Sequence, residues 1–589
     1  MDVTNEKDRE RLFRSIGHFW KTLAPFREVR AKLIQDYVGA YYNKSTAQRH
    51  RTIVNLMLQT AEAYTIAIAA NVPKFLIAAR QKENMPFAHR YKLALNSLVK
   101  EIHLDKTLQD CALDAFFGIG IVKIYMADAP LVEIEADVWM DPGEPFADRI
   151  SQDNWFHDSY ATDLRKCQCM GDWYRIPFQA LKDGRFDRKV VKKLKPTSKQ
   201  NQNDERRAAA ISSSNETDRD EYQPMIDLID VWIPGEGLVV TWALTQTGES
   251  LDIHNTNPLS VQEWEGAETG PYRHLGLGDV PDNILPTSPA SNLKHLSDLT
   301  NSLIRKQDAQ SRRQKDITLF DGNAEQDAPR VKSAKDGGYV LVNNPQGIQT
   351  LKMGGVDKGN LAFSMSTMDL FDRMSGNLKM MAGLGPQSAT ASQDKMIAQQ
   401  VGKREGAMRE KMNRFATNIG QDLAHLLFQD KVKVIQNTQE VAGYAVDATW
   451  TPERRDGEFS DFDFSVEPYS MAYQSPLQRS QVLREQLQEL MPIMQLLQGQ
   501  GIEFDARRYL EIQSELLDIP RLLEVFRFTG SVQAPGNEDS KQSPRTLREN
   551  VRTNLRGGNT PEAQRQDMMA QLLSGSDEPQ ENGQSQGGY

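Results

Sequence analysis

Apolar residues recur at three- and four-residue spacing over the first part of the chain, between residues 6 and 113. Phe13, Ile16 and Trp20 begin the pattern, and charged residues stand between them. This spacing puts the apolar side chains on one side of a helix. The chain is therefore predicted to open with an α-helical layer.

Short apolar runs replace this pattern from Gly118 onward, and Asp, Pro and Gly separate them. Runs bounded by turn residues are typical of strands. Strands are predicted over residues 119–125, 132–138, 169–176, 226–233 and 237–244, and a helix start at about residue 161. Pro234, Gly235 and Glu236 have the turn chemistry of a hairpin between the last two strands. Residues 195–222 are polar and rich in Ser and Asn, and they are predicted to form a flexible insertion.

A long helix is predicted over residues 291–316. Leu293, Leu296 and Leu299 mark one face, and the second half turns strongly polar. At 1.5 Å per residue the segment spans roughly 35 to 40 Å. Only its first half is expected to pack in a conventional core.

A small β module is predicted to follow, with strands at residues 318–320 and 339–342 and turns between them. A second helix is predicted over residues 359–382. Its apolar residues are Leu361, Phe363, Met365, Met368, Leu370, Phe371, Met374, Leu378 and Met381. A compact module is thus expected between two long helices.

Residues 383–392 are small and cannot continue either neighbouring helix. A third, longer helix is predicted over residues 393–429, with bends at Gly402, Gly406 and Gly420. The remaining elements predicted from the pattern are strands at 431–435, 445–450 and 462–466, a helical region at 476–528, and a disordered, Gln- and Gly-rich tail at 529–589.

The formal net charge of −10 argues against a protein that grips nucleic acid over its whole surface, but allows one past which DNA slides. Three cysteines are too few for a disulfide framework, which fits a reducing compartment. The N-terminus is charged, so no export peptide is expected. Residues 53–79 are the most membrane-like stretch, but polar residues interrupt them, and we predict a buried helix and its exit.

The search for catalytic chemistry is mostly negative. The sequence has neither a GxxxxGK[ST] phosphate loop nor an HExxH motif. Cys167 and Cys169, with His157 nearby, have the wrong number and spacing for structural zinc, and packing is the preferred interpretation. Asp461 and Asp463 are interpreted as solvated charges on a strand. We predict no cofactor, no metal and no enzymatic activity.

The order of these parts is more specific than any one motif. Residues 280–315, VPDNILPTSPASNLKHLSDLTNSLIRKQDAQSRRQK, and 382–415, AGLGPQSATASQDKMIAQQVGKREGAMREKMNRF, carry a resemblance to the portal proteins of tailed bacteriophages, the head-to-tail connector family. Phe156, His157 and Asp158 also look like a wing segment of that family. The resemblance covers about residues 6–528.

The resemblance implies an α+β, mainly α, subunit. Its parts are a β-rich wing over residues 1–290, with the insertion at 195–222, a first stem helix over 291–316, a small clip module over 317–356, a second stem helix over 357–382, a tunnel loop over 383–392, the long wing helix and remaining wing strands over 393–475, a helical crown over 476–528 and a disordered tail over 529–589.

The resemblance further implies a ring of about twelve copies at one capsid vertex, assembled in the bacterial host cytoplasm and retained in the virion. Double-stranded DNA passes through such a ring, which contacts the major capsid protein, the terminase and adaptor or tail proteins, and no membrane. The residues implied for DNA contact are Gln387, Ser388, Thr390 and Ser392 in the tunnel loop, with Lys379 and Lys395 beside it. Those implied for neighbouring subunits or the capsid are Arg305, Lys306, Arg312, Arg313 and Lys315. Those implied for the clip's partners are Arg330, Lys332, Lys335 and Tyr339.

Simpler structural interpretations stay open for two of these groups, the stem cations and the tunnel loop. The stem cations have the pattern of a solvated helix face, and the loop that of a simple interhelical connection. Two other functions also remain: a non-viral oligomeric scaffold or membrane-peripheral assembly protein, and a metal-dependent DNA-processing enzyme.

Overall fold

Helices make up about half of the chain in the computed structural model, and the strands form several small antiparallel sheets, so the fold is α+β. The structure describes residues 5–38, 54–69, 71–127, 132–135, 138–140, 143–184, 186–196, 223–244, 257–320, 327–334, 341, 348–353, 355–376, 391–441, 444–467, 470–471, 488, 509 and 513. The chain divides into two units, Met1–Gln474 and Ser475–Tyr589. Nearly all described residues belong to the first unit.

A helical core forms the centre of the first unit. Its helices are α2 (Ala24–Val38), α4 (Leu56–Ile68), α5 (Met85–Glu101), α6 (Leu104–Phe117) and the long α14 (Ala391–Gln429). Strand β1 (Phe75–Ala79) pairs with β18 (Phe462–Val466) beside them. The buried ring of Phe75 lies against Gly420 of α14, where any side chain would collide with it. Gly420 therefore permits close packing of α14 on β1.

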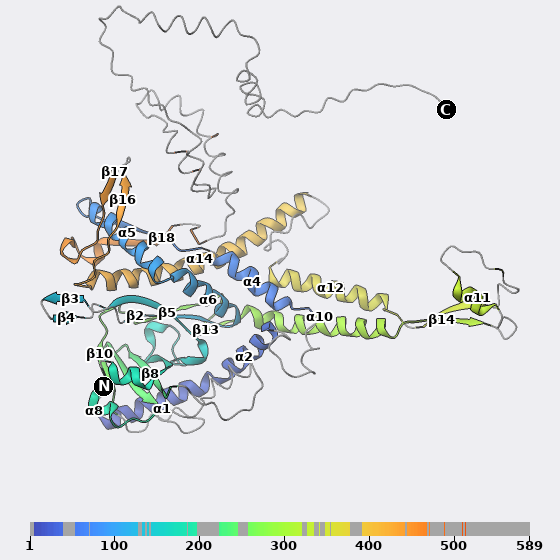
Figure 1. Cartoon of the computed structure of the whole chain (residues 1–589), viewed down its shortest axis with the longest axis horizontal. Coiled ribbons are helices and arrows are strands. Elements are labelled where there is room, and N and C mark those ends of the chain that lie inside the picture. Colours follow the sequence, from blue (N-terminus) through green and yellow to red (C-terminus); the bar gives the residue numbers. More distant parts are fainter. Residues whose placement is uncertain are drawn as a thin grey trace, which may run out of the picture. The chain divides into compact units, whose positions relative to one another are not determined.

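A five-stranded sheet forms a second core next to the helices (Figure 1). Its order is β10-β9-β8-β7-β6, with β6 Trp155–His157, β7 Met170–Pro177, β8 Met225–Ile233, β9 Leu238–Leu244 and β10 Ser260–Glu263. Helix α1 (Glu6–Thr22) packs on this core through Phe13, Ile16 and Phe19. The short helices α7 (Phe178–Asp183) and α8 (Arg188–Val191) form a third, smaller core with other residues of the sheet.

A three-stranded sheet, β11-β2-β5, also contributes to both larger cores. Its strands are β2 (Gly120–Ala127), β5 (Glu144–Ile150) and β11 (Tyr272–Leu275). The two-stranded pairs are β3 (Val132–Glu135) with β4 (Val138–Met140), β12 (Gly278–Val280) with β13 (Asn283–Thr287), and β16 (Thr438–Val441) with β17 (Tyr444–Asp447). Arg273 of β11 forms a 2.7 Å ion pair with Asp422, which fixes α14 to this sheet.

A buried lysine joins the two sheets. Asp172 of β7 and Asp230 of β8 are cross-strand partners, an arrangement in which like charges repel. Lys123 of β2 lies between them, with its Nζ 2.7 Å from Asp172 and 2.6 Å from Asp230. The hydroxyls of Tyr272, Tyr174 and Thr241 donate the remaining hydrogen bonds. Burial disfavours the lysine charge, but the two aspartates outweigh it and raise the pKa of Lys123.

A second group of buried charges links the helices to the sheets. Arg30 of α2 contacts Asp114 of α6 at 2.9 Å and Asp153 at 2.7 Å. Arg149 of β5 approaches the same Asp114 at 2.5 Å. Each of these buried charges therefore has a partner of opposite sign, which offsets the cost of burying charge between the cores.

Most predicted elements are present with shifted ends, but the helix predicted over residues 359–382 ends early, at Ser375, where Gly376 closes it. The helical layer is confirmed, with β1 inserted in it, and the predicted strands at 169–176, 226–233, 237–244 and 462–466 correspond to β7, β8, β9 and β18. The predicted strand at 132–138 is two strands, β3 and β4. The helix start near Ala161 is wrong, because a turn and a short 3-10 helix, Leu164–Lys166, occupy that stretch. The strand predicted at 431–435 is a single bridge from Ile435 to Trp450.

Residues 53–79 contain the helix α4 and the strand β1, as the interrupted pattern predicts. Among the residues that the structure describes, no helix combines the length and the apolar character needed to cross a membrane.

Replacing Lys123 by Met is expected to destabilise the protein by about 3–5 kcal/mol, because it leaves two buried aspartates facing each other without a counter-charge. Urea unfolding followed by tryptophan fluorescence measures this, since Trp155, Trp173 and Trp242 are buried in the second core. The triple variant Lys123→Met, Asp172→Asn, Asp230→Asn is expected to recover part of the loss. The exposed Lys100→Met serves as control. Equal unfolding free energies for Lys123→Met and wild type would contradict the assigned role.

Candidate functional site at the paired helices

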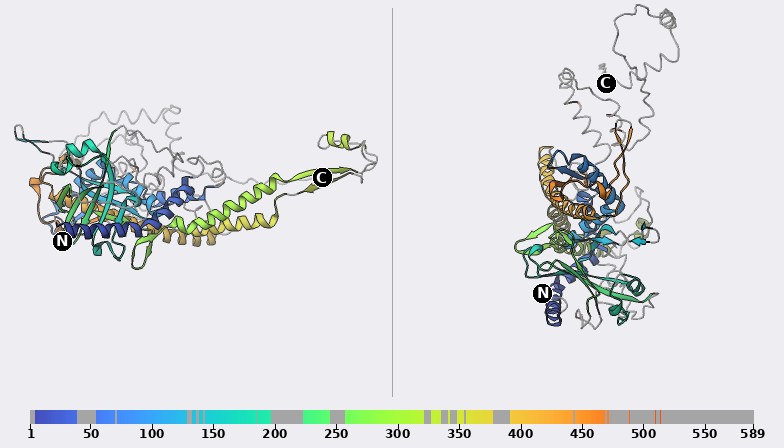
Figure 2. Two further views of the ribbon diagram at one scale, coloured as in Figure 1. Left: turned by 90° about the horizontal axis from the view of Figure 1, so that it is seen from below. Right: turned by 90° about the vertical axis from the view of Figure 1, so that its left-hand side faces the viewer.

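Helix α10 (Pro289–Arg312) begins in the body and extends away from it (Figure 2). Ser288 caps its first turn by accepting a hydrogen bond from the Ser291 amide at 3.1 Å, and Pro289 suits the first helical position. Ala290 and Leu293 are buried in the helical core. Beyond Asn301 the helix has no buried residue, so its second half is not part of the body's core.

Helix α12 (Lys358–Ser375) returns alongside α10 in the opposite direction (Figures 1 and 2). Asp357 caps its start through the amides of Gly359 and Asn360. Gly376 ends it with a φ of 97°, a left-handed conformation that favours glycine. At the body end, the Tyr64 hydroxyl donates to the Ser375 carbonyl at 2.9 Å.

Polar hydrogen bonds cross the contact between the two helices. Gln307 of α10 donates to Ser364 Oγ at 2.7 Å and to the Asn360 carbonyl at 3.1 Å. The buried residues of α12 are Ser364, Thr367, Phe371 and Ser375, and of these only Phe371, near the body, is large and apolar. The hydroxyls of Ser364, Thr367 and Ser375 donate to carbonyls of their own helix. The inner line of α12 is therefore small and internally satisfied.

Apolar side chains instead lie on both sides of this inner line. Flank A comprises Leu361, Met365 and Met368, and flank B comprises Phe363, Leu370 and Met374. Successive helical residues are about 100° apart, which puts each flank roughly 80° from the inner line, on opposite sides. The six side chains are 37% to 58% exposed. A helix that buries serines and exposes methionines, leucines and a phenylalanine has the reverse of the usual distribution.

Helix α10 has a different surface. Arg305, Lys306, Asp308, Arg312 and Arg313 are all exposed beyond the body. Arg312 pairs with Asp308 of its own helix at 3.1 Å. Among the residues of α10, Leu299 is the exposed large apolar side chain. The two helices of the pair thus present opposite chemistry to their surroundings.

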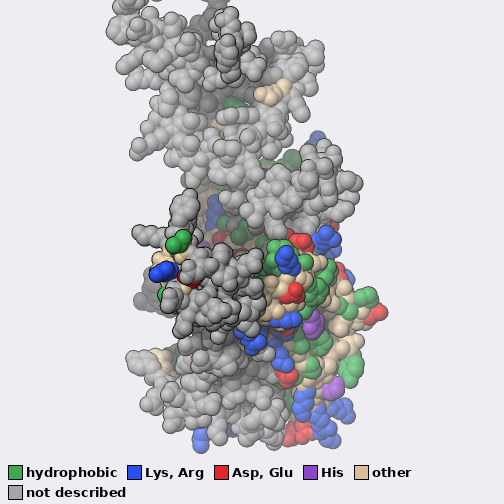
Figure 3. Space-filling model, turned by 90° about the vertical axis from the view of Figure 1, so that its right-hand side faces the viewer, with side chains coloured by type: hydrophobic (Ala, Val, Ile, Leu, Met, Phe, Trp, Pro, Cys, Tyr) green, Lys and Arg blue, Asp and Glu red, His purple; other side chains and the backbone are tan. Residues whose placement is uncertain are grey.

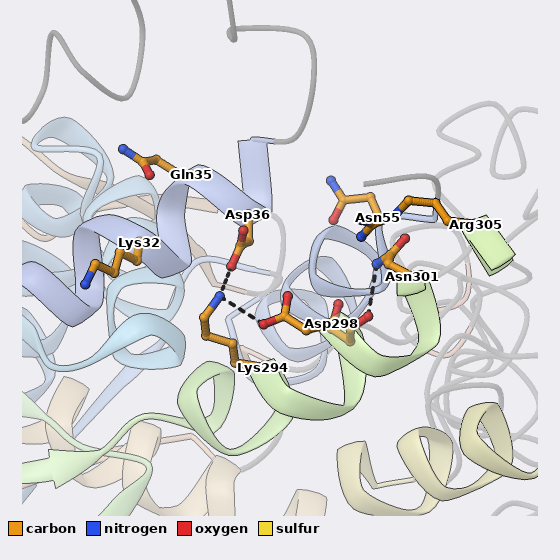
Figure 4. A pocket seen from close by; sticks show the side chains of 9 residues that line it. Lys32, Gln35, Asp36, Asn55, Lys294, Asp298, Asn301 and Arg305 are labelled. Carbon is orange, nitrogen blue, oxygen red and sulfur yellow. Dashed lines mark hydrogen bonds and ion pairs between the residues drawn. The ribbon is translucent and has the colours of Figure 1, made fainter. Parts of the chain in front are cut away.

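A polar cavity of about 540 Å³ lies where α10 leaves the body (Figure 4). Lys294 hydrogen-bonds to Asp36 of α2 and lies 3.5 Å from Asp298. Burial opposes the charge of Lys294, but the charges and hydrogen bonds of Asp36 and Asp298 together outweigh it, and the pKa of Lys294 is raised. Asn301 accepts from the Val54 amide at 3.0 Å and donates to the Val54 carbonyl at 3.2 Å. These contacts anchor α10 to α2 and to the start of α4.

A small module lies at the far end of the helix pair (Figure 1). Strand β14 (Lys315–Phe320) pairs with β15 (Ile348–Met353), and the short helix α11 (Ala328–Ser333) lies between them in sequence. The predicted compact module between two long helices is therefore present in its described part. The predicted strand at 339–342 lies outside the described residues, apart from Leu341.

The five cations predicted for the first stem helix do not all lie on α10, because the helix ends at Arg312. Arg305, Lys306 and Arg312 are on the helix, Arg313 is its cap, and Lys315 begins β14. The predicted end at residue 316 was therefore too late, because Arg313 and Gln314 close the helix with i+3 hydrogen bonds. Lys306 reaches Asn360 at 3.4 Å.

The tunnel-loop prediction falls mostly outside the described residues, which exclude Lys379, Gln387, Ser388 and Thr390. Ser392 and Lys395 belong to α14, which begins at Ala391, so the predicted loop was too long at that end. Of the predicted clip residues, Arg330 and Lys332 belong to α11, while Lys335 and Tyr339 lie outside the described residues. The predicted crown contributes only residues 488, 509 and 513.

His157, Cys167 and Cys169 are buried together near the start of the five-stranded sheet. Burial, with the charge of Asp158, raises the pKa of both thiols to about 12, so both stay protonated. His157 Nδ1 lies 2.9 Å from the Asp158 carbonyl. Within the described part of the chain, no group of three or more His, Cys, Asp or Glu side chains could hold a metal ion. The burial of all three side chains supports the packing interpretation.

Charges of both signs are mixed on the face drawn in Figure 3, where Lys and Arg lie among acidic and apolar side chains. The described part of that face carries no region of positive charge alone. A surface that holds DNA tightly needs a dense cationic footprint.

Comparison with known protein families gives no matching family model, and a search of curated proteins gives no significant match. A function is therefore inferred from the chain's own residues. The sequence reasoning noted the apolar residues of α12 but missed that they form two flanks. Their positions contained that signal, since apolar residues at 361, 363, 365, 368 and 370 cannot all lie on one face.

The buried His157 predicts a pH dependence of stability. Burial lowers its pKa to about 4, against about 6.5 in an unfolded chain. The unfolded state then binds a proton first, so His157 contributes stability that is complete above pH 6.5 and is lost as the pH falls from 6.5 toward 4. His157→Gln is expected to remove this component, which amounts to about 3 kcal/mol at most. Unfolding free energies of both proteins between pH 7.5 and 4 measure it; a difference that stays constant with pH would contradict it.

Proposed function

We propose that this chain is the subunit of a ring-shaped DNA conduit, a portal protein at one vertex of a tailed-phage capsid. In this proposal the body forms the wing, the α10–α12 pair forms the stem and the β14–β15 module forms the clip. The ring passes double-stranded DNA during packaging and ejection. It also provides the surface on which the capsid protein, terminase and adaptor or tail proteins dock.

The observation that carries the proposal is the pair of apolar flanks on α12. A single partner would cover one exposed flank, but flanks A and B lie on opposite sides of one helix. A contact in which flank A of one copy meets flank B of the next is head-to-tail, and such contacts close into a ring when the rotation divides the circle. Flank burial supplies about 1.5–3 kcal/mol for each large apolar side chain that becomes fully covered.

The position of the small module supports the same proposal. The β14–β15 pair sits where α10 and α12 are farthest from the body, as a clip would. The formal net charge of −10 suits a wall past which DNA moves. A non-viral scaffold ring would use the same flank contacts. It differs from a portal only because no DNA passes through it. For the enzyme alternative, the described residues offer no metal-binding group.

The purified full-length chain is expected to form uniform rings with a central hole, seen by negative-stain microscopy and counted by native mass spectrometry. Addition of phage procapsid shells formed without this chain, with linear DNA and a terminase, distinguishes a portal from a scaffold, because only a portal restores DNA packaging. A chain that stays monomeric at all concentrations and salt conditions would refute the proposal.

Two single substitutions test the head-to-tail contact. Met365→Glu on flank A and Leu370→Glu on flank B are each expected to block rings, because every contact needs one of each flank. A mixture of the two variants retains one intact contact between unlike copies and is expected to give heterodimers. Ala309→Glu, on the exposed side of α10, is the control and is expected to keep rings. If either variant alone formed a stable dimer, the contacts would be A-to-A and B-to-B, against the proposal.

A further inference from the structure

Helix α12 has a fourth face besides its inner line and its two flanks. Lys358, Ala362, Ser366, Asp369 and Arg373 occupy it, and all five are exposed. Their spacing of four and three residues keeps them on one line, roughly opposite the inner line that contacts α10. We call these residues the outer line.

We propose that α12 forms the inner layer of the ring and that the outer line faces the DNA. This proposal rests on the proposed function, since it assigns the surfaces of α12 within the ring. It names a DNA-facing surface in the described part of the chain, separate from residues 383–392.

The spacing of helices in a ring decides which helix is inside. Packed helices lie 8–10 Å apart, so about twelve copies of α12 in flank-to-flank contact make a circle roughly 34 Å across between axes. Subtracting one helix diameter of 10–12 Å leaves an opening of roughly 23 Å, which admits a DNA duplex. A second layer of helices about 9 Å farther out has axes roughly 14 Å apart, too far for direct contact between copies.

The two helices have the surfaces that these two layers require. The inner helix must be apolar on both sides, and α12 carries flanks A and B. The outer helix stays in water between its neighbours, and α10 exposes Arg305, Lys306, Asp308, Arg312 and Arg313. The reverse arrangement would crowd the cations of α10 together and leave both flanks of α12 wet.

The middle of the outer line suits a duplex that must keep moving. Ala362 and Ser366 are small and uncharged, and Asp369 repels phosphate. Each cation that neutralises a phosphate adds salt-sensitive affinity. The cations Lys358 and Arg373 stand apart at the two ends of the line, and between them the ring repeats a methyl, a hydroxyl and a carboxylate.

Single cysteines test the assignment of the layers. The native Cys111, Cys167 and Cys169 are buried, and burial raises the pKa of each, so wild type is an unreactive background. The variants are Ala362→Cys on the outer line, Met365→Cys on flank A and Ala309→Cys on the exposed side of α10. Each is made alone and in the Leu370→Glu background, which does not assemble. A biotin maleimide probes access by small molecules, and streptavidin, which is too wide for the opening, then distinguishes lumen from exterior.

Rings of the Ala362→Cys variant are expected to react with the maleimide but to bind streptavidin only after denaturation. Rings of Ala309→Cys are expected to react and to bind streptavidin while intact. The thiol of Met365→Cys is expected to react roughly tenfold or more slowly in rings than in the unassembled background, because the neighbouring copy covers it. In that background the introduced thiols of all three variants are expected to react.

If intact Ala362→Cys rings bound streptavidin and intact Ala309→Cys rings did not, the layers would be reversed, which would overturn this inference while leaving the proposed function intact. Equal reactivity of the Met365→Cys thiol in rings and in the unassembled background would overturn it as well. Absence of rings from wild type would overturn both the proposed function and the inference that rests on it.

Discussion

The charge of one lysine relieves the repulsion between two adjacent strands of one sheet and links them to a second sheet. Asp172 and Asp230 face each other across adjacent strands, and Lys123 enters between them from a different sheet. Since the three charges are buried, removing any one of them leaves a buried charge without a partner and costs much of the protein's stability. The position of β2 relative to the five-stranded sheet follows from this contact. Helix α6 leads directly into β2, and its Phe116 carbonyl accepts a hydrogen bond from Ser288, the residue that caps α10. The lysine network thus helps set where the α10–α12 pair leaves the body.

The helix pair follows a different principle from the body. In the body, charges are buried in pairs and apolar side chains fill the cores. In the pair, small polar residues make the internal contact, and large apolar residues remain on the flanks. Contacts at the root fix the pair to the body through Lys294, Asn301 and Tyr64. Farther out, burying the exposed flanks of α12 would add hydrophobic stabilisation that the pair lacks on its own. In the proposed ring, that stabilisation comes from the neighbours.

Sequence periodicity was sufficient for much of the fold and insufficient for the site. Helix α14 and strand β18 follow closely from their apolar spacing, because β18 and the part of α14 whose side chains are described, residues 406–429, each bury one consistent face. The pairing of β1 with β18, and the meeting of Lys123 with Asp172 and Asp230, depend on chain segments far apart in sequence, which no local pattern encodes. Gly420 shows the same limit: inside a helical pattern it predicted a bend, whereas the ring of Phe75 from a distant strand explains it. On α12 the apolar residues were visible, but not which face α10 covers, since serine and threonine at a buried helix contact carry no hydrophobic signal.

The separation of body and helix pair also bears on how such a protein assembles. The two larger cores and their paired charges form within one copy, although large apolar side chains such as Phe26, Ile66 and Met85 remain exposed on the body. The flanks of α12 remain exposed in one copy, and each needs a different surface to cover it. A head-to-tail row of copies always leaves one flank A and one flank B exposed at its ends, and only closure covers both. The last contact therefore buries two flanks without adding a copy, which favours closed rings over open rows. In the proposed ring, the exposed flanks therefore give each copy a physical reason to complete the circle.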